Sequence, residues 1–144
     1  MPASFSIAIA DSSPVFRMGM TSLVKNAGDF SLVGEAETPH ELRDLVRNFS
    51  PDLVIFDFLS DGFSVDDLIE IRRVSPGIRI LAITPQQSGS ALINALRAGV
   101  DSYVKKNCSL GEVMEAIQET AIGGRFFCGQ ILEAIRQESI NVED

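Results

Sequence analysis

Four apolar segments of this chain each run into polar side chains of complementary chemistry. The residues that follow these segments are Asp11, Asp57, Thr84, Lys105 and Lys106. Carboxylates bind hard cations, a hydroxyl can donate to a phosphoryl oxygen, and an ammonium can neutralise one. If the segments end at a common place, the chain carries a suitable set of groups for a metal ion and a phosphoryl group.

The segments themselves have the pattern of strands in a parallel sheet. Leu53 to Phe56 is uninterruptedly apolar, which is typical of a strand buried on both faces. Strands are expected at 5–10, 31–36, 53–57, 78–83 and 103–104. Helix patterns separate them, which predicts an α/β fold with right-handed crossovers. Because the carboxyl ends of parallel strands meet at one edge of the sheet, the polar residues are expected to converge there.

Helix starts and stops support this alternation. Ser13 followed by Pro14 is an N-cap with a proline at the first helical position, and that helix is expected to stop near Gly28. A later helix is expected from about Gln87 to Ala98. A last helix pattern covers about 129–139, with Ile131, Leu132 and Ile135 on one side. That last helix either folds back on the domain or serves as a linker or a partner-binding helix.

Size and charge limit the class of protein. A chain of 144 residues fits one domain with a proper core. Twenty acidic and twelve basic residues give a formal charge of −8, which disfavours direct contact with nucleic acid, although the charge also keeps a domain soluble. Cys108 and Cys128 are the only cysteines and predict reduced thiols rather than a disulfide framework or a zinc site. No leader or bilayer-spanning stretch is evident, so a cytoplasmic protein without membrane contact is expected.

Several fragments resemble receiver domains of two-component response regulators, in the NarL/FixJ (LuxR-type) subfamily. These fragments are 9–17, 33–36, 51–57 and 98–103, and the resemblance covers residues 5 to about 122. It implies a flavodoxin-like, doubly wound (βα)5 fold with five parallel strands in the order 2-1-3-4-5, plus a C-terminal linker helix. The expected division is a receiver domain at 1–122 and a linker at 123–144, helical around 129–139.

The resemblance also assigns roles to the residues at the strand ends. Asp57 would be the phosphoacceptor, Thr84 the switch hydroxyl and Tyr103 the coupled aromatic residue. Lys106, three positions after the aromatic residue, would neutralise a phosphoryl oxygen. A Mg²⁺ ion would be held by Asp11, Asp57 and the backbone carbonyl of Leu59.

Two positions depart from the family pattern. Where the family usually has a second acid after the first strand, this chain has Ser12, and a neutral hydroxyl is a poorer ligand for Mg²⁺. Pro85 follows Thr84 directly and has no N–H to donate to a phosphoryl oxygen. Asp61, in the loop after Asp57, offers a partial replacement for the missing acid.

Three classes of function compete at this point. The first is a phosphorylation switch: a histidine kinase phosphorylates Asp57, which changes conformation and dimerisation. The second is a degenerate receiver that regulates or dimerises without phosphate. The third is a flavodoxin-like cofactor binder, but the turn from Asp11 to Pro14 lacks the glycine of a phosphate loop.

The resemblance implies a regulatory protein rather than an enzyme. Its subfamily controls transcription through a C-terminal helix-turn-helix domain, which would be the only part to contact DNA and is not present in this chain. The chain is therefore expected to be truncated before that domain, with a stand-alone receiver as the alternative. A homodimer is expected, through either the first and fifth helices or the face around the fourth helix and the fifth strand.

Overall fold

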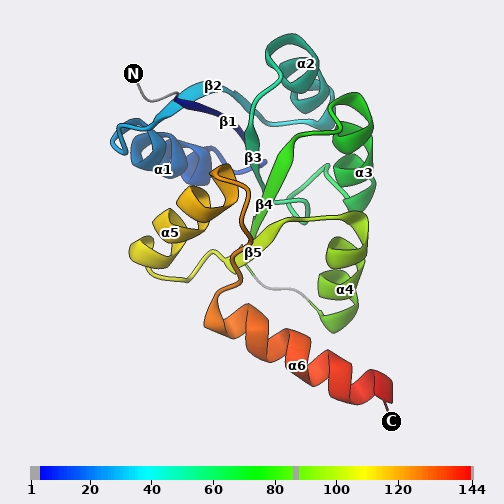
Figure 1. Ribbon diagram of the computed structural model, residues 1–144. Coiled ribbons are helices and arrows are strands. Elements are labelled where there is room, and N and C mark those ends of the chain that lie inside the picture. The colour runs from blue at the N-terminus through cyan, green and yellow to red at the C-terminus, as the bar shows by residue number, and fades with distance from the viewer. Residues whose placement is uncertain (1–3, 86–87, 144) are drawn as a thin grey trace.

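Five parallel strands form one central sheet in the order β2-β1-β3-β4-β5 (Figure 1). The computed structural model describes residues 4–85 and 88–143. The strands are β1 (Phe5–Ala10), β2 (Phe30–Ala36), β3 (Leu53–Phe56), β4 (Arg79–Thr84) and β5 (Ser102–Lys105). The order and direction of the strands confirm the predicted flavodoxin-like fold class.

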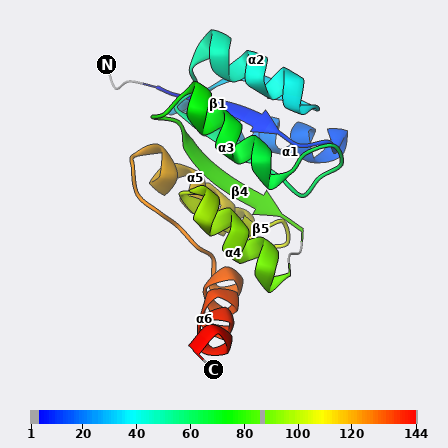
Figure 2. The ribbon, with the colours of Figure 1, turned by 90° about the vertical axis from the view of Figure 1, so that its right-hand side faces the viewer.

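Helices cover both faces of this sheet. They are α1 (Pro14–Lys25), α2 (Pro39–Phe49), α3 (Val65–Val74), α4 (Gly89–Ala98), α5 (Leu110–Ala121) and α6 (Gly129–Glu143). Helices α1 and α5 lie on one face, and α2, α3 and α4 lie on the other (Figures 1 and 2). Each crossover helix follows the carboxyl end of a strand, so residues between strand and helix gather at one edge of the sheet.

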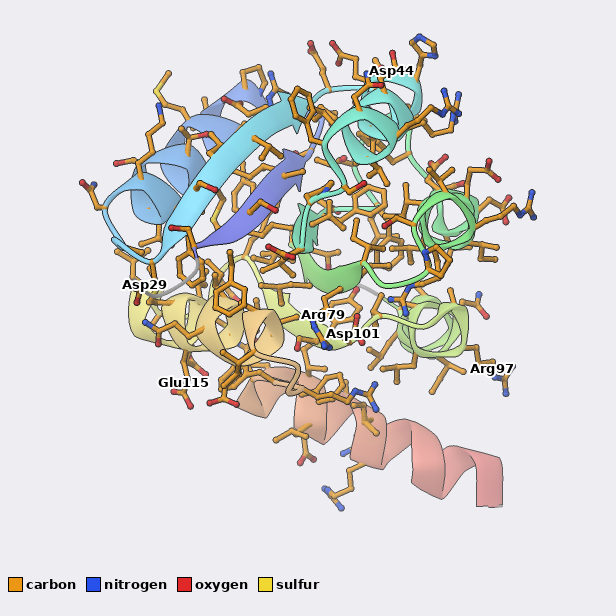
Figure 3. All side chains as sticks on the ribbon, turned by 45° about the horizontal axis from the view of Figure 1, so that its top comes forward. Asp29, Asp44, Arg79, Arg97, Asp101 and Glu115 are labelled. Atoms are coloured by element: carbon orange, nitrogen blue, oxygen red, sulfur yellow. The ribbon has the colours of Figure 1, made fainter. Side chains whose placement is uncertain are left out.

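The core lies between the sheet and these helices. All four residues of β3 are buried, as the uninterrupted apolar pattern predicted. Charged side chains such as Asp44, Arg97 and Glu115 point outward from the helices (Figure 3). The sheet is therefore shielded from solvent on both faces, and its chemistry is restricted to its ends.

Most observed element bounds differ from the predicted ones by one or two residues, as expected at element ends. Helix α1, however, ends at Lys25, three residues before Gly28, and α6 continues to Glu143, four residues beyond the predicted end. Strand β3 ends at Phe56, so Asp57 is the first residue after the strand. Strand β4 runs from Arg79 to Thr84, one residue later than predicted, and β5 is longer than predicted. The predicted start of the fourth helix at Gln87 lies outside the described residues. Residues 1–3 of the predicted receiver domain and residue 144 of the predicted linker also lie outside them.

The C-terminal segment packs against the domain. Helix α6 lies beyond the β5 edge of the sheet and contacts α4 and β5 (Figures 1 and 2). Ile131 is completely buried, whereas Leu132 is 54% exposed. Of the three arrangements left open for this segment, folding back on the domain is the observed one. Among the described residues, no helix has the length and apolar character needed to cross a bilayer.

Candidate functional site

Two buried carboxylates lie side by side at the carboxyl edge of the sheet. Strands β1 and β3 pair in register, with Ala10 opposite Phe56, so that Asp11 and Asp57 emerge together. The backbone N–H of Asp57 donates to the carbonyl of Ala10, 3.0 Å away, and extends that pairing by one residue. The exposed fractions of Asp11 and Asp57 are 0% and 2%. Carboxylates are rarely so deeply buried unless a cation compensates them.

The cation is Lys106. Its Nζ lies 2.8 Å from Oδ2 of Asp11 and 2.8 Å from Oδ2 of Asp57. Lys106 is placed by its backbone N–H, which donates to the carbonyl of Thr84 across a 2.8 Å hydrogen bond at the end of β4. The structure therefore brings Asp11, Asp57 and Lys106 together as the sequence predicted. Lys105 is the last residue of β5 and makes no ion pair among the described residues.

Backbone groups fix the two carboxylates. Ser13 caps α1 by accepting from the N–H of Phe16, and its own N–H donates to Oδ1 of Asp11 at 2.8 Å. The N–H of Leu59 donates to Oδ1 of Asp57 at 2.9 Å. Each carboxylate thus has one oxygen held by the backbone and the other facing Lys106.

Burial and charge shift the pKa values of the site in a consistent way. Desolvation raises the pKa of Asp57 above its ordinary value of 3.8, although the hydrogen bond from Lys106 opposes that shift. Burial lowers the pKa of Lys106, but the hydrogen bonds to Asp11 and Asp57 outweigh that effect and raise it overall. Lys106 is therefore firmly charged, while the ionised form of Asp57 is costly.

The same groups partly fit the predicted Mg²⁺ ion. Oδ2 of Asp11 is buried, and its partner among the described residues is the ammonium of Lys106, 2.8 Å away. An oxygen of this kind is a suitable ligand for a hard cation, and Mg²⁺ needs only one or two carboxylates from a protein. Within residues 4–85 and 88–143, however, no three acidic, histidine or cysteine side chains gather as a metal cluster.

Thr84 and Tyr103 form a second, buried part of the site. The two hydroxyl oxygens are 2.9 Å apart and both residues are fully buried. The ring of Phe58 lies edge-on to that of Tyr103, with centroids 6.1 Å apart. Burial raises the pKa of Tyr103 to about 12, so the phenol keeps its proton and can donate it. The predicted switch pair is thus in direct contact.

Ser12 and Pro85 flank the carboxylates and the hydroxyl pair. The N–H of Ser12 donates to Oγ of Ser60 at 3.1 Å, and that Oγ donates to the carbonyl of Asp57 at 2.8 Å. Ser60 therefore bridges the loops after β1 and β3. Asp61, the suggested replacement acid, is exposed and has no contact with Asp57 among the described hydrogen bonds and ion pairs. Pro85 is exposed directly after β4.

Sequence reasoning missed three residues that support the site. Besides Ser60, these are Phe16, whose ring centroid lies 4.2 Å from Nζ of Lys106, and Arg17, whose Nη1 donates to the carbonyl of Asp11 at 2.6 Å. Phe16 occupies an apolar position of α1 and packs against the hydrophobic core, which is all that its residue type indicates. A cation over an aromatic ring leaves no periodic signal in a sequence, so only the packing of α1 beside the β5–α5 loop reveals this contact.

The sequence of this chain is similar to those of known proteins. Residues 7–118 match the family described as the response regulator receiver domain. The chain belongs to this family. Response regulator protein VraR of Staphylococcus aureus is 28% identical over 134 residues, which are 92% of this chain and 64% of VraR. The chain thus spans 64% of the length of that relative.

Solved structures agree with the family assignment. A LuxR-family two-component response regulator from Aurantimonas sp. superposes with a TM-score of 0.88 at 27% identity, covering 96% of this chain and 99% of the other. The RcsB response regulator of Salmonella typhimurium, at 18% identity, shares the fold with a TM-score of 0.87, covering 95% of this chain and 68% of RcsB. RcsB is also known as dimers bound to DNA. The likeness to a LuxR-family regulator agrees with the subfamily that the sequence fragments resemble.

The raised pKa of Asp57 leads to a prediction about stability. Between 3.8 and the folded-state pKa, the folded protein binds a proton that the unfolded chain releases, so this group costs stability as the pH rises through that interval. Asp57→Asn cannot ionise. We expect its free energy of unfolding in urea to exceed that of the wild type at neutral pH. The difference should shrink as the pH is lowered toward 3.8.

Asp61→Asn is the matched control, because it changes an exposed acid four residues away. Its free energy of unfolding at neutral pH should stay within about 0.5 kcal/mol of the wild type. A wild type that is more stable than Asp57→Asn at neutral pH, by a margin that grows with pH, would contradict this account of the buried carboxylate.

Proposed function

We propose that Asp57 accepts a phosphoryl group from a histidine kinase and that this receiver is a phosphorylation switch. The observation that carries the proposal is the placement of Nζ of Lys106 at 2.8 Å from both buried carboxylates. In the transfer, an oxygen of Asp57 attacks phosphorus, the bond from phosphorus to the imidazole nitrogen of the kinase breaks, and the imidazole keeps the electron pair. A carboxylate is a weak nucleophile that repels the incoming phosphate, so it needs nearby positive charge.

Lys106 and Thr84 have separate tasks in this proposal. Lys106 compensates the charge that moves onto the transferred group as a compact point charge. Its raised pKa keeps it charged throughout the physiological range. The hydroxyl of Thr84, at the end of β4, donates to an oxygen of the phosphoryl group once that group is on Asp57. Thr84 can then only accept a hydrogen bond from Tyr103, and this fixed donor direction carries the signal away from the site.

Mg²⁺ is the cofactor that the resemblance to receiver domains implies for this chemistry. We propose that Asp11, Asp57 and the backbone carbonyl of Leu59 hold it. The ion would supply the charge that lets carboxylate and phosphoryl oxygens approach each other. Ser12 supplies no carboxylate, so affinity for the ion is expected to be lower than in receivers with two acids at this position.

A homodimer through α1 and α5 is the proposed output. Val15, Met18 and Leu110 are largely exposed and lie near the starts of these helices, which cover the same face of the sheet. The alternative face, around α4 and β5, is contacted by the chain's own α6. Exposed apolar groups on paired helices favour contact with a second copy.

Transcription control belongs to the longer protein in this proposal. Residues 1–122 act as the receiver and 123–144 as the segment that leads to a DNA-binding domain, as in regulators of the LuxR type. The acidic charge of −8 makes this part of the protein unsuited to contact DNA by itself.

A degenerate receiver is the second candidate. Ser12 and Pro85 favour it, since they remove one Mg²⁺ ligand and one hydrogen-bond donor from the site. Such a module would regulate or dimerise without being phosphorylated. It differs from the first candidate in one measurable respect, the covalent modification of Asp57.

Incubation with acetyl phosphate tests directly whether Asp57 is phosphorylated. After incubation with acetyl phosphate and Mg²⁺, intact-mass spectrometry should detect one added phosphoryl group on the wild-type chain and none on Asp57→Asn. Asp61→Asn should be labelled like the wild type, because its side chain is exposed and outside the site. No labelling of the wild type would favour the degenerate receiver, and equal labelling of Asp57→Asn would refute the assignment of the acceptor.

The two atypical positions give a second prediction. Ser12→Asp combined with Pro85→Ala restores an acid and a backbone donor, and should raise labelling about tenfold or more, because a charge-assisted hydrogen bond contributes about 1.5–3 kcal/mol. The control is Ser31→Asp combined with Pro76→Ala, the same changes at exposed positions away from the site. Labelling that is unchanged in the first pair, or raised equally in both, would show that these positions do not limit phosphorylation.

A further inference from the structure

The segment Arg125–Ile131, called here the docking segment, runs along the outer edge of β5. Tyr103 forms a parallel bridge with Phe127. The N–H of Tyr103 donates to the carbonyl of Phe126 at 2.9 Å, and the N–H of Cys128 donates to the carbonyl of Tyr103 at 3.3 Å. Both backbone groups of Tyr103 are thereby used by the docking segment, which occupies the edge that β5 would otherwise leave open.

Side chains hold the docking segment in place at both of its ends. At its start, Nε and Nη2 of Arg125 donate to the carbonyls of Asp101 and Val100, at 3.0 and 3.2 Å. At its end, Cys128 and Ile131 are buried and belong to the hydrophobic core. The docking segment is therefore packed against the domain as part of its structure.

The docking segment also reaches the loop that carries Lys106. Nε2 of Gln130 donates to Oδ1 of Asn107, the residue directly after Lys106, at 3.2 Å. Nε2 of Gln130 also lies 4.0 Å from Sγ of Cys108 in the same loop. Through Tyr103 and through this loop, the docking segment touches two neighbours of the phosphoacceptor site.

The side chain of Tyr103 reaches the end of β4. Its hydroxyl is bonded to Oγ1 of Thr84, with both residues fully buried. Tyr103 therefore connects the docking segment, by its backbone, with the hydroxyl that the proposed function assigns to the phosphoryl group.

We propose that the docking segment and the Thr84–Tyr103 hydroxyl pair form one coupled unit, so that occupation of Asp57 tightens the docking of the C-terminal helix. This inference rests on the proposed function of Asp57. A threonine hydroxyl has one proton. When Thr84 donates this proton to a phosphoryl oxygen, Thr84 can no longer donate to Tyr103. The hydrogen bond between the two residues must then be donated by Tyr103, and this holds the phenol in its buried position. The two backbone bonds of Tyr103 to the docking segment are then held as well.

Coupling between two equilibria is reciprocal. If occupation of Asp57 tightens docking, then docking must strengthen occupation of Asp57 by the same factor. A chain whose docking segment is released should therefore bind a phosphoryl analogue more weakly, although none of the residues that touch the analogue has changed.

Amide hydrogen exchange of the 144-residue chain tests the coupling without any ligand. Tyr103→Phe removes only the phenolic hydroxyl. We expect it to speed exchange of the Cys128 amide about two- to tenfold, the equivalent of one ordinary hydrogen bond, while the amide of Ile55 in β3 keeps its rate. An unchanged rate at Cys128, or an equal change at Ile55 that reports only lower global stability, would overturn the proposal.

Beryllium fluoride with Mg²⁺ tests the connection to Asp57, with binding followed by fluorine NMR. Bound analogue should slow exchange at Cys128, and Ile131→Ser should weaken its binding while the exposed neighbour variant Leu132→Ser should not. Bound analogue with unchanged exchange at Cys128, or equal binding by both variants, would overturn the coupling. Failure of the wild type to bind would count against the proposed function, and the Tyr103→Phe comparison would still decide whether the hydroxyl pair controls docking.

Discussion

The ammonium of Lys106 between two buried carboxylates is the interaction on which the rest of the site depends. Asp11 and Asp57 are neighbours only because β1 and β3 pair in parallel and in register, and they can stay buried only because Lys106 lies 2.8 Å from each. The remaining contacts orient these three groups. The backbone fixes one oxygen of each carboxylate, and the ring of Phe16 lies beside Nζ of Lys106.

In the proposed function, this arrangement favours phosphoryl transfer at a cost in stability. A carboxylate with a raised pKa is costly to ionise in the folded state, and a bound phosphoryl group or metal ion would relieve part of that cost. The neighbouring Thr84–Tyr103 pair is neutral and buried, so it responds to the placement of the Thr84 hydroxyl rather than to charge. In the proposed coupling, Tyr103 transmits a change in that placement to the docking segment at the outer edge of β5. Chemistry at one end of the sheet and packing at its side are thereby connected through a single residue.

Much of the site could be predicted because its residues directly follow strands. An apolar run such as Leu53 to Phe56 identifies a buried strand, and the parallel arrangement then places Asp57 at the edge shared with Asp11. Contacts made by helices and loops could not be predicted in the same way from the sequence. Ser60 bridges two loops, and the docking of residues after 124 depends on an edge that only the folded sheet provides. Ile131 and Leu132 had the same apolar signal, yet only Ile131 is buried.

Titration of the Asp57 carboxyl carbon by NMR is the most direct test of this account, because it measures the balance between burial and Lys106. In the wild type, Asp57 should titrate above 3.8, and in Lys106→Met its pKa should rise further, since the opposing cation is gone. Lys105→Met, which removes the neighbouring lysine, should leave the titration of Asp57 unchanged. A pKa at or below 3.8, or one that does not respond to Lys106→Met, would contradict the central claim.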